Sequence, residues 1–98
     1  MKATDIKIDV REAVNIAEKY FDSVKDMMGL QVNDLRLEEV ELSEDKNFWL
    51  ITLGFNRLTD TAKNPLGLPT IPRQEREYKI FNIDAQTGEV KSMKIREV

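Results

Sequence analysis

One helical segment near the N-terminus constrains the fold more than any other feature, because only strand-like sequence follows it. Asp9 fits an N-cap, Glu12 stands three residues further on as in a capping box, and Gly29 fits a C-terminal stop. Between these ends the apolar side chains recur at helical spacing: Val10, Ala13, Val14, Ala17, Tyr20, Phe21, Val24, Met27 and Met28. A single amphipathic helix from about Asp9 to Met28 is therefore predicted, and its apolar stripe must be buried against strands.

Residues 76–96 read as two strands joined by a tight turn. The flanks are rich in β-branched and aromatic residues, and Asp84 opens a turn that closes at Gly88. An aspartate can hydrogen-bond the backbone of its own turn, and we expect Gly88 to adopt a positive φ because glycine does so at little steric cost.

Two further strands are predicted between the helix and this hairpin. Residues 35–42 carry Leu35 and Leu37 in one phase, whereas the later apolar residues fall in the other, which indicates a bulge near Glu38. Residues 48–56 form the strongest strand, apolar in both phases. Short connections favour a meander. The predicted fold class is α+β: one N-terminal amphipathic helix packed on a four-stranded antiparallel meander sheet, forming a single domain over residues 1–98.

Three pieces of this pattern resemble a PepSY-type domain: the helix opening at residues 9–17, the strand that contains Trp49, and residues 78–90 with their Ile-Asp and Thr-Gly turn. The resemblance implies a broadly cystatin-like arrangement of one helix on an antiparallel sheet. It also implies an association with secreted or cell-envelope proteins and a proposed role in inhibiting peptidases, without catalytic residues.

Composition excludes several kinds of chemistry. The chain has no cysteine and no histidine, so thiol chemistry and the commonest general base and metal ligand are missing. A net charge of −3 argues against broad nucleic-acid binding. No apolar run has the length of a signal peptide or a membrane span, so we expect a cytoplasmic protein that contacts no membrane. We also expect no catalytic residues, no cofactor and no metal.

Two features indicate a binding surface. One helix covers one face of a sheet, which leaves Phe48 and Leu50 on the other face. The segment 57–74 carries three prolines and the apolar residues Leu66, Leu68 and Ile71, and its flanks either extend the neighbouring strands or form a mobile loop.

We therefore expect a small non-enzymatic binding domain that contacts a protein partner, or a second copy of itself in a homodimer, through these five residues. The alternative is a peptidase-inhibitor-like module that inserts the 57–74 segment into a cleft.

Overall fold

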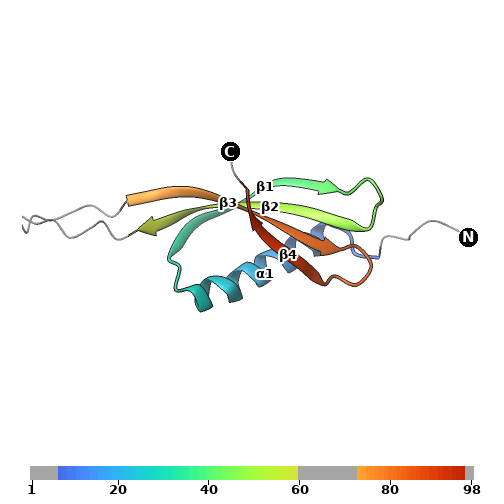
Figure 1. The fold of residues 1–98 in the computed structure, drawn as a ribbon, viewed down its shortest axis with the longest axis horizontal. Helices are drawn as coiled ribbons and strands as arrows, with labels where there is room; N and C mark the ends of the chain where they lie inside the picture. Colours follow the sequence, from blue (N-terminus) through green and yellow to red (C-terminus); the bar gives the residue numbers. More distant parts are fainter. Residues whose placement is uncertain (1–6, 60–72, 97–98) are drawn as a thin grey trace, which may run out of the picture.

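The computed structural model describes residues 7–59 and 73–96, as one helix and one antiparallel sheet (Figure 1). The helix α1 spans Val10–Met28, and the strands are β1 (Val32–Leu42), β2 (Phe48–Thr59), β3 (Arg73–Asp84) and β4 (Val90–Ile95). The strands pair in the order β1-β2-β3-β4, so each strand lies beside its neighbour in the sequence. The predicted α+β class, with one helix on a four-stranded antiparallel meander, is confirmed.

Both predicted helix caps are present. Asp9 has extended backbone angles, and its side-chain oxygen accepts a hydrogen bond of 2.8 Å from the backbone N–H of Glu12. Gly29 adopts the left-handed conformation with φ of 68°, and the N–H groups of Gly29 and Leu30 donate to carbonyls of the last helical turn. These caps satisfy backbone groups that a helix of this length leaves unpaired at its ends.

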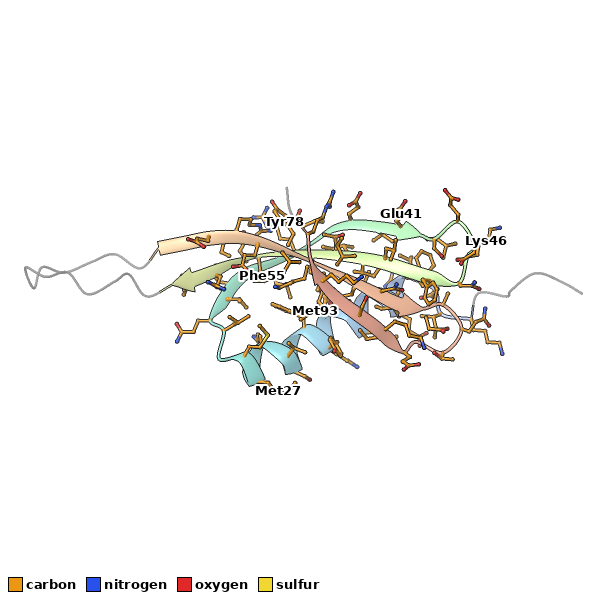
Figure 2. The ribbon with its side chains drawn as sticks, in the orientation of Figure 1. Met27, Glu41, Lys46, Phe55, Tyr78 and Met93 are labelled. Carbon is orange, nitrogen blue, oxygen red and sulfur yellow. The ribbon has the colours of Figure 1, made fainter. Side chains whose placement is uncertain are left out.

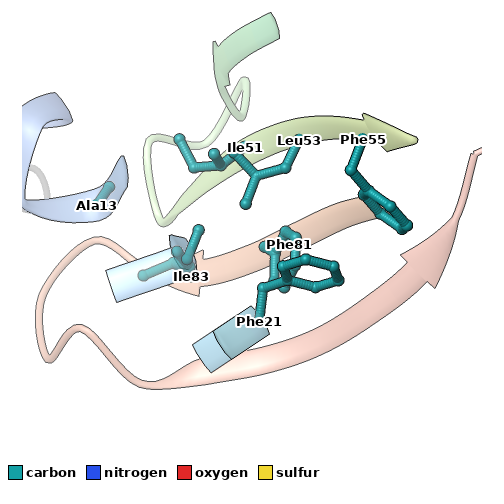
Figure 3. Packing of buried hydrophobic residues seen from close by; sticks show 8 residues of the cluster. Ala13, Phe21, Ile51, Leu53, Phe55, Phe81 and Ile83 are labelled. Atoms are coloured by element: carbon teal, nitrogen blue, oxygen red, sulfur yellow. The ribbon is translucent and has the colours of Figure 1, made fainter. Parts of the chain in front are cut away.

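The core lies between α1 and the middle strands (Figure 3). Phe21 packs between two rings of the sheet, with ring centroids 4.7 Å from Phe55 and 6.3 Å from Phe81. Ala13 and Ala17 are also fully buried, and their small side chains let the helix backbone approach the sheet. The sheet contributes the buried side chains Ile51, Leu53, Phe55, Phe81 and Ile83.

The buried stripe of α1 is narrower than the sequence predicts. Met27 is 78% exposed and points away from the sheet at the end of α1 (Figure 2), and Val10, Tyr20 and Met28 are also exposed. The expectation that all nine stripe residues are core is therefore wrong. One buried residue per turn, at Ala13, Ala17 and Phe21, satisfies the contact with the sheet, and the last turn lies outside it.

The first strand begins earlier than predicted and bends twice. It starts at Val32 instead of Leu35, because its first residues pair with the far end of β2. The register shifts between Asn33 and Arg36, where Asp34 has a positive φ of 54°, and again between Leu37 and Glu39. The second shift confirms the predicted bulge.

The central pair of strands is longer than predicted. β2 continues past Asn56 to Thr59, and β3 begins at Arg73, opposite Thr59. Of the two possibilities for segment 57–74, the extension of the neighbouring strands is therefore correct for its flanks.

Hydrogen bonds connect the turn between β3 and β4 to the segment that precedes α1. Asp84 Oδ1 accepts hydrogen bonds from the backbone N–H groups of Gln86 and Thr87, and Gly88 has a φ of 80°, as predicted. The carbonyl of the buried Ala85 accepts hydrogen bonds of 3.0 Å from the N–H groups of Lys7 and Ile8. The indole N–H of Trp49 donates to the carbonyl of Ile8, which closes one end of the core.

Candidate functional site

The inner side of β1 carries apolar side chains that the helix leaves uncovered. The bulge at Glu38 restores the alternation, so that Leu37 and Val40 both lie on the helix side, opposite Leu53 and Ile51 of β2. The helix packs mainly on β2, β3 and β4. Val40 is half-buried against the core, but Leu37 is 46% exposed.

Leu35 extends this exposed apolar surface toward the helix. It is 39% exposed and lines a shallow groove whose other lining residues come from α1. The helix residues along this groove are all polar: Asn15, Glu18, Lys19 and Asp22. We call Leu35, Leu37 and these four helix residues the β1 flank. Exposed apolar side chains beside polar ones are typical of protein-binding surfaces.

The opposite face of the sheet carries Phe48 and Leu50, as predicted, but it is better covered than predicted. Both side chains are half-buried. Across the middle of this face, Arg96 Nη1 donates a 2.5 Å hydrogen bond to Glu39 Oε1, which joins the end of β4 to β1. Thr52, which pairs with Glu39, is only 3% exposed. Long charged side chains thus lie over part of the face that no helix covers.

A second ion-pair network lies on the same face. Arg76 of β3 donates to Glu38 and to Asp34 of β1, at 2.5 and 3.4 Å, and its guanidinium lies 5.9 Å from the ring centre of Tyr78. The hydrogen bond to Glu38 raises the pKa of Arg76. Gly54 lies beneath this network, since a Cβ atom there would overlap the Glu38 side chain. The network fixes the bulged strand to β3 across the strand between them.

The structure describes two of the five predicted site residues. Phe48 and Leu50 lie on the face opposite α1, whereas Leu66, Leu68 and Ile71 lie outside the described residues. Sequence reasoning missed Leu35 and Leu37 as site residues. The sequence signal was the change in the alternation of apolar residues along residues 35–42. This change predicted a bulge, but it did not indicate which part of the sheet α1 leaves uncovered.

Within residues 7–59 and 73–96, no three acidic side chains are grouped so that they could hold a metal ion. In the same ranges, no helix combines the length and apolar composition needed to cross a membrane. Comparison with protein-family models, with curated proteins and with solved structures gave no match.

Proposed function

We propose that this chain is a non-enzymatic protein-binding domain whose β1 flank contacts the partner. The observation that carries the proposal is the exposure of Leu35 and Leu37 next to each other on the side of the sheet that faces the helix. Burying exposed apolar surface contributes about 25 cal/mol per Å², so two leucines can anchor a contact surrounded by polar residues.

The β1 flank is a better candidate than the face that carries Phe48 and Leu50. On that face the two apolar side chains are already half-buried, and the ion pair between Glu39 and Arg96 would have to be displaced by a partner. On the β1 flank, by contrast, Leu35 and Leu37 are exposed without such a cover. A second copy of the chain is one partner that this surface can accept. The PepSY-like character of the domain remains part of the proposal, and it rests on the sequence resemblance of residues 9–17, the strand that contains Trp49 and residues 78–90.

The test compares association of the wild type with that of the double variant Leu35→Ser/Leu37→Ser. A matched control, Val10→Ser/Met27→Ser, removes two other exposed apolar side chains that do not line the groove. If the β1 flank is the binding surface, only the first variant loses its partner. Equal association of the two variants would contradict the proposal.

A further inference from the structure

The outer edge of β1 has no neighbouring strand among the elements that the structure describes. In the sheet order β1-β2-β3-β4, β1 pairs with β2 alone (Figure 1). The side chains from Asn33 to Glu39 and that of Glu41 are exposed. Bulges, prolines or a covering element usually protect such an edge against pairing with another chain. Whether β1 can accept a further strand therefore depends on how much of its edge is protected.

Only the first half of β1 has such protection. Both register shifts fall between Asn33 and Glu39, and a bulge twists an edge away from a potential partner. From Glu39 to Leu42 the pairing with β2 continues without a shift, and this part contains no proline. We call residues 39–42 the straight part of β1. It is the part with which a further strand can pair.

The hydrogen bonds to β2 determine which backbone groups of the straight part point outward. The N–H of Ser43 donates to the carbonyl of Phe48 at 2.9 Å, so residues 43 and 48 form a hydrogen-bonded pair. Hydrogen-bonded and non-hydrogen-bonded pairs alternate along an antiparallel ladder. Glu41 therefore directs its N–H and C=O toward β2, whereas Val40 and Leu42 direct theirs toward the open edge. Backbone donors and acceptors thus face the edge in the arrangement that an added strand requires.

The charge at this end of β1 is negative. Glu41 lies on the face away from α1 (Figure 2), and within the described part of the chain its carboxylate has no ion pair and no hydrogen bond. The turn that follows β1 adds two carboxylates, Glu44 and Asp45, against the single cation Lys46. A cationic side chain placed opposite Glu41 would therefore match the local charge.

The helix side of the same stretch is apolar. Val40 and Leu42 lie on this side, opposite Ile51 and Trp49 of β2, and both are half-buried. Leu37, beyond the bulge, is 46% exposed. Because side chains alternate along a strand, an added strand would place every second side chain beside these apolar residues.

We propose that the straight part of β1 binds an extended segment of a partner protein in which apolar and cationic residues alternate. The segment pairs antiparallel with β1 and adds one strand to the sheet. Its apolar side chains lie beside Val40 and Leu42, and a lysine or arginine lies opposite Glu41. This last pair is a non-hydrogen-bonded one, in which the side chains of the two strands are closest. This mode of binding rests on the proposed function, because the segment belongs to the partner that contacts the β1 flank.

The charges of β1 disfavour a second copy of the chain as the occupant. If two straight parts pair antiparallel with Val40 opposite Val40, Glu41 of one copy lies opposite Glu39 of the other. If Val40 lies opposite Leu42, the two Glu41 side chains lie opposite each other. Like charges directly opposite each other in neighbouring strands are destabilising.

The test is titration of the whole chain with short peptides, followed by backbone amide chemical shifts. The probe is acetyl-Val-Lys-Val-Lys-Val-amide, and a second peptide carries glutamine in place of both lysines. We expect the lysine peptide to bind about threefold more tightly, because of the ion pair with Glu41, and to lose this advantage at high salt. The amides of Val40 and Leu42 should shift most, because their N–H groups gain new acceptors.

Two controls separate the charge from the backbone pairing. In Glu41→Gln the lysine peptide should lose its advantage, whereas Asp26→Asn, which changes an exposed carboxylate on α1, should bind it like the wild type. N-methylation of the central valine of the peptide removes a donor that faces β1, and should abolish binding. N-methylation of the second lysine leaves every donor toward β1 in place, and should have little effect.

Three results would overturn the proposal. The first is equal affinity for the lysine and glutamine peptides, or binding of neither. The second is an equal effect of N-methylation at the two positions, which would show that the peptide does not pair with β1 as a strand. The third is an unchanged preference for lysine in Glu41→Gln.

Failure of this proposal differs from failure of the proposed function. If Leu35→Ser/Leu37→Ser loses its partner but no peptide binds the edge, strand addition is wrong and the β1 flank remains the binding surface. If the peptides bind as expected but that variant keeps its partner, the edge binds the segment without the β1 flank, and the proposed function is wrong.

Discussion

Glu38 on β1 and Arg76 on β3 form an ion pair of 2.5 Å across β2, at the position where β2 has Gly54. The two strands are not neighbours, so their side chains can meet only if the strand between them leaves room. The bulge directs Glu38 toward this gap, and a Cβ atom at Gly54 would overlap it. The absence of a side chain at one residue thus allows a contact between two others.

The ion pair predicts a coupling free energy between Glu38 and Arg76 that depends on the absence of a side chain at Gly54. In a double-mutant cycle with Glu38→Gln and Arg76→Met, we expect a coupling free energy of roughly 1 kcal/mol at low salt, because both side chains are partly exposed. In the background of Gly54→Ala the coupling should vanish, since the methyl group displaces the Glu38 carboxylate. Denaturant melts of the eight proteins measure both values, and an unchanged coupling in the alanine background would show that the pair does not need the gap.

The aromatic contact between α1 and the sheet predicts a large loss of stability. Phe21→Ala removes a ring that is fully buried between Phe55 and Phe81, and should lower the free energy of unfolding by about 3–5 kcal/mol. Met27→Ala, on the same helix but mostly exposed, should change it by less than about 0.5 kcal/mol. Similar losses in the two variants would mean that the helix is rotated from the orientation described.

Gly29 and Gly88 both have a positive φ, but only Gly88 has a side chain close to the position of a new Cβ atom. Comparing the same substitution at both positions therefore distinguishes the cost of backbone strain from the cost of packing. Gly29→Ala and Gly88→Ala both place a side chain in the left-handed region, which costs about 1 kcal/mol. At Gly88 the new Cβ atom would also lie 3.0 Å from Cδ1 of Ile16, whereas nothing lies near it at Gly29. We expect Gly88→Ala to be the more destabilising by at least about 0.5 kcal/mol. In the background of Ile16→Val, which lacks that Cδ1, the difference should disappear; its persistence would contradict the packing explanation.

The lowered pKa of Asp84 predicts that the fold loses stability at acidic pH. Hydrogen bonds from the backbone N–H groups of Thr87 and Gln86 lower the pKa of Asp84. A carboxylate with a lowered pKa in the folded state stabilises the fold above its unfolded pKa of about 3.9, and this contribution is lost as the pH falls through the folded pKa. We therefore expect the wild type to have a higher melting temperature than Asp84→Asn at pH 6. This difference in melting temperature should be smaller at pH 2.5. A difference that stays constant over this range would show that the charge of Asp84 is unimportant for the turn.

Local patterns predicted most of the fold. The caps at Asp9 and Gly29, the bulge at Glu38 and the positive φ of Gly88 each depend on a few consecutive residues, so the sequence shows them directly. The extension of β2 to Thr59 was only one of two possibilities at the sequence level, because its pairing with Arg73 joins two segments that are separated by thirteen residues.

The candidate surfaces depend on the placement of whole elements and could not be predicted in the same way. Whether Leu35 and Leu37 are exposed depends on which strands α1 covers, and periodicity along α1 does not determine this.

The most direct test of the proposed binding function is affinity capture from the source cells, quantified by mass spectrometry, together with sedimentation velocity of the purified chain. Wild type, Leu35→Ser/Leu37→Ser and the control Val10→Ser/Met27→Ser are compared after melts confirm that all three are folded. We expect the wild type and the control to associate with the same protein, or with a second copy, and the Leu35→Ser/Leu37→Ser variant to lose that association by at least about tenfold, or roughly 1.4 kcal/mol. Identical association by all three proteins, or the absence of any association, would contradict a protein-binding role for the β1 flank.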